Sequence, residues 1–292
     1  MAIIAVSGKI NSGKDTVGKI IQYLDALKKY SDIQPSFEEF SILSEKEIRD
    51  NPYLDDSISD WEIKKFADKL KDIVCLLLSC TREQLEDSDF KNKELGEEWW
   101  YYKTPSKSLI SYLDNNQPDF IKRYELIKTT PRLLLQLLGT ECGRDILHPN
   151  IWVNALMSEY VPIDIVRGKV TEKSEKKYLS YPSWCITDMR FPNEMEAVKN
   201  RGGITIRINR TVEDVFYQLG VEKFGTKFTR EVLNEDTIKD MQKYVTEKEH
   251  PSETSLDNAE FDYVIHNNGT IEELIEKVKI ILIEHYVIQH TS

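Results

Sequence analysis

A glycine-bounded pattern near the beginning of the chain constrains the fold more than any other feature. Ile3–Val6 form a short apolar run that is typical of a buried strand. Gly8–Lys14 then fit the spacing G-x-x-x-x-G-K, and apolar residues recur from Val17 to Leu24 with the period of a helix buried on one face. This order of strand, turn and helix predicts a loop that binds the phosphates of a nucleotide.

The residue types in this loop suit the chemistry of a polyphosphate. Backbone N–H groups of the turn and of the first helical residues point into one concavity, where the helix dipole also favours an anion. Gly8 and Gly13 allow the backbone to approach closely, and Lys14 reaches the β- and γ-phosphates. Asp15 stands where the general motif has a Ser or Thr that binds Mg²⁺. We therefore expect Asp15 to hold the metal through water and Thr16 to serve an α-phosphate.

Length and charge limit the class of protein. A chain of 292 residues with 40% hydrophobic content can bury the core of one large domain. The formal charge of −11 argues against a broad surface for a nucleic-acid polymer. The sequence shows no basic leader and no apolar run long enough to cross a bilayer, so we expect a cytoplasmic protein without a membrane partner.

Cysteines and histidines do not follow a metal-binding spacing. The four cysteines, Cys75, Cys80, Cys142 and Cys185, are scattered, and the five histidines show neither HxxxH nor HExxH spacing. We expect buried reduced thiols and no protein-bound transition metal.

Four further apolar runs are interpreted as strands. They are Trp61–Ala67, Trp184–Asp188, Ile204–Ile208 and Phe261–His266, and helical patterns separate them. Together with the first strand they make five strands that alternate with helices. This alternation predicts an α/β fold with a parallel sheet covered on both faces.

Several segments between these elements have no clear pattern. Residues 31–60 look like an insertion or a poorly packed surface segment, and residues 161–183 look like a long exposed loop. Residues 211–254 are helical and charged, and either a covering lid or a solvated helical hairpin explains them. The aromatic rings of Trp99–Tyr102 either stack on a base or pack between helices, and the sequence leaves both alternatives open.

A well-marked helix start provides a second candidate site. Thr130 suits the N-cap and Pro131 the first helical position. Arg132 then lies at the helix start, where its planar guanidinium can bind a phosphate through two hydrogen bonds. A surface arginine on an amphipathic helix is the alternative, but polar residues at 139–144 and Trp152 favour a site.

Charged residues also follow two of the predicted strands. Asp188 ends the strand that begins at Trp184, and in an open parallel sheet ligands bind beyond the carboxyl ends of strands. Arg190 follows two residues later. Lys71, near the start of the helix after the second strand, either binds a second anion or is simply solvated.

Short motifs along most of the chain resemble those of the tailed-phage deoxynucleoside monophosphate kinases. The motifs occur in the same order as in that family, and residues 31–60 and 161–183 lie outside them. They are Ser7-Gly8, Ser12–Thr16, Pro131-Arg132, Leu134–Gln136, Leu138–Glu141, Trp152, Asp188–Glu194, His250–Glu253 and Phe261–Thr270.

The resemblance implies a P-loop three-layer fold with a five-stranded parallel sheet, a helical substrate-binding insertion and a lid. We expect a single P-loop kinase domain over residues 1–292. Its core comprises about 1–30, 61–80, 184–210 and 255–292, its insertion about 81–160 and its lid about 211–254.

The resemblance also implies roles for individual residues. The residues assigned to ATP are Asn11, Ser12, Gly13, Lys14, Asp15, Thr16, Asn267 and Gly269. Those assigned to the monophosphate substrate are Phe66, Lys71, Arg132, Gln136, Thr140, Trp152, Asp188, Arg190 and Glu194. The catalytic charges are assigned to Lys14, Arg132, Arg144 and Arg190, and the metal to Asp15 and Asp188.

The expected reaction moves the γ-phosphoryl group of ATP, with Mg²⁺, onto a deoxynucleoside 5′-monophosphate. The attacking group is an ionised phosphate oxygen, so no general base is required. The base of the substrate and a homodimeric state are left open. A kinase for another small phosphate is the first alternative, because phosphomevalonate kinases have a similar Ser-Gly-Lys-Asp loop. A nucleotide-binding module without catalysis and a structural protein with a vestigial loop are the others.

Overall fold

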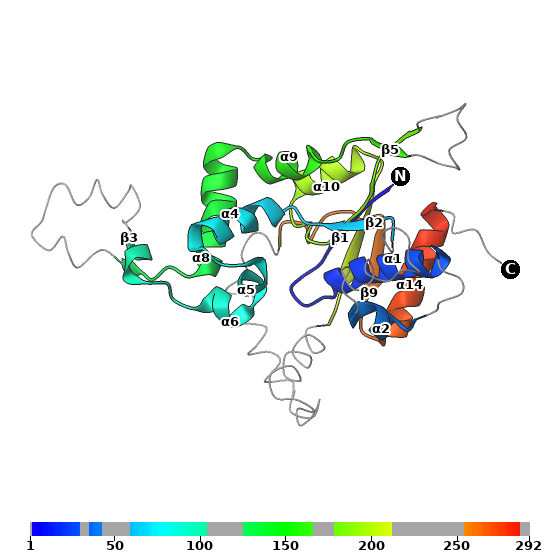
Figure 1. The fold of residues 1–292 in the computed structure, drawn as a ribbon, viewed down its shortest axis with the longest axis horizontal. Coiled ribbons are helices and arrows are strands. Elements are labelled where there is room, and N and C mark those ends of the chain that lie inside the picture. Colours follow the sequence, from blue (N-terminus) through cyan, green and yellow to red (C-terminus); the bar gives the residue numbers. More distant parts are fainter. Residues whose placement is uncertain are drawn as a thin grey trace, which may run out of the picture. The chain divides into compact units, whose positions relative to one another are not determined.

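The computed structural model of the chain describes residues 2–29, 35–42, 59–103, 125–165, 178–211 and 254–286 (Figure 1). These residues belong to two compact units, which we describe separately. Unit 1 contains Met1–Phe66 and Val153–Ser292, and unit 2 contains Ala67–Trp152. Unit 2 therefore begins nearer the N-terminus than the helical insertion expected at about 81–160.

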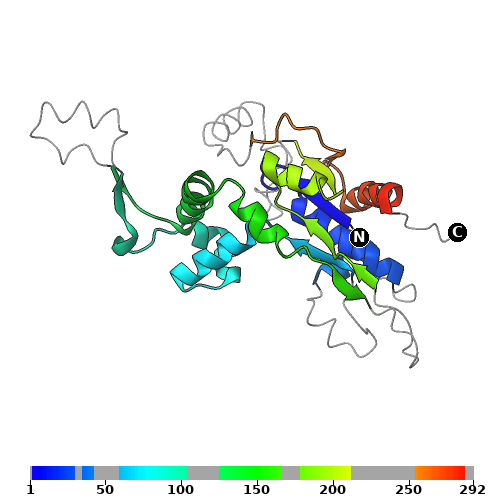
Figure 2. The ribbon, with the colours of Figure 1, turned by 90° about the horizontal axis from the view of Figure 1, so that it is seen from above.

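Unit 1 is built on the five-stranded parallel sheet that the sequence predicts. Its strands are β1 (Ala2–Ser7), β2 (Trp61–Lys64), β7 (Ser183–Ile186), β8 (Ile204–Asn209) and β9 (Tyr263–His266). Their spatial order is β2-β7-β1-β8-β9, and each neighbouring pair is parallel (Figure 2). The first strand in the chain thus lies at the centre of the sheet. Each predicted strand is confirmed, although the last begins at Tyr263 instead of Phe261.

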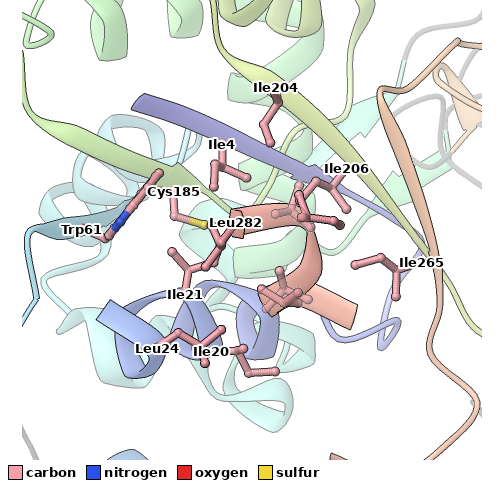
Figure 3. Packing of buried hydrophobic residues seen from close by; sticks show 14 of the residues in the cluster. Ile4, Ile20, Ile21, Leu24, Trp61, Cys185, Ile204, Ile206, Ile265 and Leu282 are labelled. Atoms are coloured by element: carbon pink, nitrogen blue, oxygen red, sulfur yellow. The ribbon is translucent and has the colours of Figure 1, made fainter. Parts of the chain in front are cut away.

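One face of the sheet is covered by α1 (Lys14–Lys29) and α14 (Ile271–Tyr286). Successive side chains of a strand point to opposite faces, so Ile4 and Val6 of β1 face the same way. Both are fully buried with Ile21 of α1 and Leu282 of α14 in one cluster, which Figure 3 shows from close by. The buried stripe predicted from Val17 to Leu24 is confirmed in α1.

The opposite face of the sheet is covered by α10 (Pro192–Lys199) and the end of α9 (Ile151–Met157). Ile3 and Ala5 of β1 point to this face and are buried with Met195 of α10 and Leu156 of α9. Unit 1 therefore has three layers, with helices on both sides of the sheet. This is the α/β architecture expected from the alternation of strands and helices.

The strand order brings separate loops to one edge of the sheet. The parallel registers pair Ser7 with Arg207, Ala5 with Ile186 and Asn209 with His266. The carboxyl ends of the strands therefore lie side by side, and the segments that follow them begin at a common edge. Ligands bind beyond this edge in open parallel sheets.

Two irregular segments of the sequence contain regular structure. Residues 37–42 form α2 (Phe37–Ile42), whose Phe37 ring packs against Tyr23 with centroids 5.4 Å apart. Strands β5 (Ile163–Ile165) and β6 (Tyr178–Ser180) pair antiparallel, and Ser183 already belongs to β7. The prediction of one long loop over residues 161–183 is therefore wrong at both ends of that segment. The expected lid at 211–254 falls almost entirely outside the described residues.

Unit 2 consists of short helices around a small apolar core. Leu70, Val74, Leu85 and Trp152 form this core, and all four are buried. The elements of the unit are α4 (Asp68–Leu78), α5 (Arg82–Glu86), α6 (Ser88–Asn92), a 3-10 turn (Glu97–Trp99), β3 (Tyr101–Lys103), β4 (Glu125–Ile127), α8 (Pro131–Gln136) and a π-helix (Leu137–Leu147).

Helix α8 begins as the sequence predicts. Thr130 accepts a hydrogen bond from the backbone N–H of Leu133, at 3.1 Å, and Pro131 occupies the first turn. The continuation as a π-helix over Leu137–Leu147 was not predicted. Because π-helical turns are rare and frequent at functional sites, this stretch stands out in unit 2.

The four cysteines all lie among the described residues, and none of them forms a disulfide. Cys185 is buried, and burial raises the pKa of its thiol. Cys75, Cys80 and Cys142 are half-buried instead of fully buried. Over the described ranges we find no helix long and apolar enough to cross a membrane and no cluster of three or more metal-ligating side chains.

Candidate active site

The loop Gly8–Lys14 connects β1 to α1 in a tight backbone path. Asn11 and Gly13 have positive φ angles of 58° and 101°. The Ser12 N–H donates to the Lys9 carbonyl at 3.2 Å, and the Val17 N–H donates to the Gly13 carbonyl at 3.0 Å as the helix begins. A left-handed conformation at Gly13 is accessible to glycine at little steric cost.

Neighbouring groups also exclude side chains at the two glycines. A Cβ at Gly8 would come within 2.5 Å of the Ile208 carbonyl, and one at Gly13 would lie 2.6 Å from Asn267 Nδ2. Ser12 is 2% exposed, and its Oγ is a buried polar atom with no hydrogen-bond partner among the residues that the structure describes. A buried unsatisfied hydroxyl is costly, and an anion bound in the loop can satisfy it.

Lys14 lies over the same loop. Its Nζ donates to the carbonyls of Gly8 and Lys9, each at 2.7 Å. These bonds place the ammonium group beside the backbone that the motif assigns to phosphates. Lysine is a mobile point charge with three donors, so Lys14 can contact more than one acceptor at once.

Asp15 is held by two side chains from other strands. Thr187 Oγ1, just after β7, donates to Asp15 Oδ1 at 2.6 Å, and Lys65 Nζ, just after β2, lies 2.9 Å from the same oxygen. Partial burial favours a higher pKa for Asp15. The hydrogen bonds from Lys65 and Thr187 and the charges of Lys65 and Lys14 outweigh that effect, so its pKa is lowered. Asp15 is therefore ionised at neutral pH.

The loop after β9 closes one side of a pocket. Asn267 is 6% exposed; its Nδ2 donates to the Ser12 carbonyl at 2.9 Å, and its backbone N–H donates to the Asn209 carbonyl at 2.8 Å. Arg210 joins the same groups, because its Nε donates to the Asn267 carbonyl at 3.1 Å and its Nη1 to the Asn11 carbonyl at 3.3 Å.

The pocket between these segments has a volume of about 420 Å³. It combines a polar end at the Gly8–Lys14 loop with apolar side chains of α14. Its lining residues are Asn11, Gly13, Lys14, Asp15, Thr16, Arg210, Asn267, Gly269, Thr270, Ile271 and Leu274.

Asp188 and Glu194 make backbone contacts at the end of β7. Asp188 Oδ1 accepts a hydrogen bond from the Phe66 N–H at 2.8 Å. Glu194 is 1% exposed, and its Oε2 accepts from the N–H groups of Arg190 and Phe191 at 2.7 and 3.0 Å. Glu194 therefore holds the turn that carries Arg190.

The other residues predicted to bind the substrate belong to unit 2. Arg132 is exposed, and its Nε donates to Asn92 Oδ1 at 2.8 Å. Lys71 forms an ion pair with Glu86. Trp152 is buried and donates through Nε1 to the Gly139 carbonyl at 2.8 Å, whereas Gln136, Thr140 and Arg144 are half-buried.

Comparison with known proteins decides the family. The model of the family described as deoxynucleotide monophosphate kinase matches residues 2–218. The chain belongs to the deoxynucleotide monophosphate kinase family. It is accordingly a kinase.

Two curated relatives carry matching names. The deoxynucleoside-5′-monophosphate kinase of Escherichia phage T5 is 26% identical over 212 residues, which is 68% of this chain and 71% of the phage protein. A putative deoxynucleotide monophosphate kinase of Acanthamoeba polyphaga mimivirus is 27% identical over 159 residues, 51% of this chain and 59% of that protein. The crystal structure of TT1252 from Thermus thermophilus is 14% identical with 97% of each chain covered; its TM-score of 0.35 supports no conclusion about the fold.

The structure gathers the residues that the sequence assigned to ATP in this kinase. All of them line the pocket except Ser12, whose carbonyl is bonded to Asn267. Sequence reasoning did not assign Arg210, Lys65 or Thr187 to the site. Arg210 could have been assigned from the sequence, because it comes just after one of the predicted strands. Lys65 and Thr187 gave no such signal, because their meeting at Asp15 depends on the strand order.

Proposed function

We propose that this kinase transfers the γ-phosphoryl group of ATP to a deoxynucleoside 5′-monophosphate. One observation carries the donor half of the proposal. Asn267, which follows the last strand, lines a pocket of about 420 Å³ together with Gly13 and Lys14 of the first loop, and it is bonded to the Ser12 carbonyl in that loop. The acceptor half is supported by membership in the deoxynucleotide monophosphate kinase family.

In the proposed reaction, a phosphate oxygen of the monophosphate attacks the γ-phosphorus of ATP in line. A new P–O bond forms as the bond between the γ-phosphorus and the β,γ-bridging oxygen breaks. The products are ADP and the deoxynucleoside diphosphate. Because the attacking oxygen is already ionised, no side chain has to remove a proton, and catalysis consists of alignment and positive charge.

The pocket suits a nucleoside triphosphate along its whole length. Gly13, Lys14 and Thr16 line the end expected for the phosphates, next to the buried Ser12 in the same loop. Ile271 and Leu274 of α14 provide an apolar surface at which we place the base, next to Asn267 and Gly269. The pocket therefore offers polar groups to the phosphates and an apolar surface to the base.

Mg²⁺ would supply charge neutralisation between the donor phosphates. The residues present fit this ion: Asp15 is ionised, and the contacts of Thr187 and Lys65 are both to its Oδ1 and not to its Oδ2. Carboxylate oxygens and water are the ligands that Mg²⁺ prefers. We propose Asp15 and Asp188 as the residues that hold it.

For the monophosphate we propose the residues assigned from the sequence. Arg190 and Arg132 provide guanidinium groups, and Arg144 is a further candidate for the transferring group. Asp188 and Glu194 hold the segments of Phe66 and Arg190, so their backbone bonds support positioning roles. The remaining members of the set are Phe66, Lys71, Gln136, Thr140 and Trp152.

A coupled ADP-release assay tests the function. The purified chain is given ATP, Mg²⁺ and in turn each dNMP, each NMP and phosphomevalonate. We expect turnover with at least one dNMP and loss of turnover in Lys14→Met. Turnover with phosphomevalonate alone, or ATP binding without transfer to any acceptor, contradicts the proposal.

Arg190→Ala tests the assigned catalytic charge. A well-placed arginine contributes about 10³-fold or more to phosphoryl transfer, so kcat should fall by that order while ATP binding persists. The matched control is Arg201→Ala, because Arg201 is exposed and its Nη1 donates to the Ala197 carbonyl of the preceding helix α10. Unchanged transfer in Arg190→Ala contradicts the role.

A further inference from the structure

Three elements of unit 1 meet at one carboxylate oxygen. Asp15 comes from the first turn of α1, Lys65 follows β2, and Thr187 follows β7. Lys65 Nζ and Thr187 Oγ1 approach Asp15 Oδ1 to 2.9 and 2.6 Å. The Thr187 N–H also donates to the Lys64 carbonyl at 3.2 Å, which fixes the ends of β2 and β7 against each other.

The strand order explains how Lys65 reaches this position. β7 lies between β2 and β1 in the sheet, so a residue after β2 must extend past the end of β7 to contact the loop after β1. Thr187 stands at the end of β7 and contacts the same oxygen. Close packing supports the arrangement, because a Cβ at Gly18 of α1 would lie 2.7 Å from Thr187 Cγ2.

A carboxylate at this place needs an explanation. It follows Lys14 directly, in a loop that we propose binds phosphates, and a negative charge there repels them. In the general motif the side chain after the lysine lies at the metal that bridges the β- and γ-phosphates. A cation bonded to Asp15 therefore stands beside the position of the γ-phosphate.

We propose that Lys65 is a second phosphate-binding cation of the donor site, and that Asp15 and Thr187 position it. The proposal rests on the proposed function and deepens it. Lys65 contacts the γ-phosphate of ATP, which ADP lacks. Lys65 therefore favours the triphosphate over the diphosphate before any transfer occurs.

Binding measurements test this without requiring catalysis. The affinities of the chain for a non-hydrolysable ATP analogue and for ADP are measured by calorimetry with Mg²⁺. A hydrogen bond to a charged group corresponds to about a 10- to 100-fold change in affinity. Lys65→Met should lower the affinity for the ATP analogue by that factor and leave the affinity for ADP nearly unchanged. Lys65→Arg should retain most of the preference for the analogue over ADP. Equal loss for both nucleotides, or no loss, overturns the proposal.

Lys64→Met is the matched control. Lys64 is the neighbouring lysine, and its side chain is 25% exposed against 26% for Lys65. Its Nζ instead pairs with Glu62 at 2.8 Å and lies 5.2 Å from the Trp184 ring centroid. We expect the ATP-analogue and ADP affinities of Lys64→Met to equal those of the wild type.

A double mutant separates phosphate binding from simple neutralisation of Asp15. For this comparison the wild type and both variants are measured without Mg²⁺, because we also propose that Asp15 holds the metal. If Lys65 only compensates the carboxylate, removing both charges in Asp15→Asn with Lys65→Met restores affinity for the metal-free analogue. If Lys65 binds the phosphate, the double mutant binds as weakly as Lys65→Met. Thr187→Val should lie between the wild type and Lys65→Met, and thermal unfolding of each variant verifies that it is folded.

Activity distinguishes failure of this inference from failure of the proposed function. A wild type that binds the analogue but phosphorylates no dNMP contradicts the function, and the ratio of analogue to ADP affinity still tests Lys65. A wild type that phosphorylates a dNMP, with an unaltered ratio in Lys65→Met, contradicts the inference alone. In an active enzyme we also expect kcat of Lys65→Met to fall by about 10- to 100-fold.

Discussion

Asn267 Nδ2 donates a hydrogen bond of 2.9 Å to the carbonyl of Ser12, a residue 255 positions earlier in the chain. Both residues are buried, so the bond is protected from water. It connects the loop after the last strand to the loop after the first. The shape of the pocket lined by Asn267 therefore depends on segments from both ends of the chain.

Replacing Asn267 should loosen this connection. Asn267→Ala leaves the Ser12 carbonyl without its partner, and a buried group in that state costs about 1–3 kcal/mol. We expect a lower free energy of unfolding by that amount, measured with urea, and weaker binding of an ATP analogue. Asn258→Ala, at an exposed position, is the control and should change neither quantity. Equal effects of the two variants would contradict the role of the bond.

Gly13→Ala should damage the pocket by two effects. The φ angle of Gly13 is 101°, and a Cβ would meet Asn267 Nδ2 at 2.6 Å. Gly202→Ala isolates the first effect, because Gly202 has a φ of 70° and nothing within 4 Å of an added Cβ. We expect Gly202→Ala to lose about 1–2 kcal/mol of stability and to keep ATP-analogue affinity. Gly13→Ala should lose both, as measured by thermal unfolding and calorimetry.

Arg210 should matter through its planar guanidinium group. Its Nε and Nη1 donate to the carbonyls of Asn267 and Asn11, which lie on opposite loops of the pocket. We expect Arg210→Ala and Arg210→Lys to weaken ATP-analogue binding by about tenfold, since lysine cannot reproduce two fixed bonds. Arg201→Ala should bind normally. Full affinity in Arg210→Lys would show that charge alone suffices.

Variants of Glu194 distinguish a role in positioning Arg190 from direct contact with the monophosphate. Its buried carboxylate accepts from two backbone N–H groups, so Glu194→Ala should cost about 2–3 kcal/mol in urea unfolding. Glu194→Gln retains an acceptor of the same shape. If Glu194 only positions Arg190, the glutamine variant keeps most of kcat and KM for the monophosphate. Glu196→Ala, exposed on the same helix, is the stability control.

The ion pair between Lys71 and Glu86 should make the stability of unit 2 depend on pH. Burial pushes the pKa of Glu86 upward, but the hydrogen bond from Lys71 and the charges of Lys71 and Lys91 prevail, so its pKa is below the usual 4.5. A lowered pKa means that the folded state binds the proton less well than the unfolded state. The resulting stabilisation is present above pH 4.5 and lost as the pH falls through the folded value.

Glu86→Gln should therefore flatten the decline of the melting temperature below pH 4.5. At pH 7 it should cost less than about 1 kcal/mol, because the pair is partly exposed to solvent. Lys71→Met should produce only part of this flattening, because Lys91 still pairs with Glu86 at 3.3 Å. An acid profile of Glu86→Gln that equals that of the wild type would contradict this contribution.

Local patterns in the sequence predicted much of unit 1 and the start of one helix in unit 2. The apolar runs located all five strands, and Thr130 with Pro131 located the start of α8. The Gly8–Lys14 spacing identified the loop that lines the pocket. These predictions succeed because neighbouring residues determine hydrophobic periodicity, caps and tight turns.

The features that were missed depend on residues far apart in the chain or lie in short segments without a distinctive pattern. Lys65 and Thr187 meet Asp15 because β7 lies between β2 and β1, and a strand order is not written in any single segment. The strands β5 and β6 have only three residues each, which is too short for their alternation to stand out in a charged segment. The π-helix after Gln136 continues an ordinary helical pattern of leucines, which gives no sign of a wider turn.

The central place of β1 also has a consequence for synthesis of the chain. Ile3 and Ile4 pair with strands that contain Trp184 and Ile204, so neither neighbour of β1 exists until much of the chain has been made. During translation this hydrophobic segment therefore stays unpaired until its partner strands have been synthesised. Such a delay favours slow folding and aggregation. Chaperones that bind the β1 segment during synthesis should therefore raise the yield of this kinase more than those that act after release.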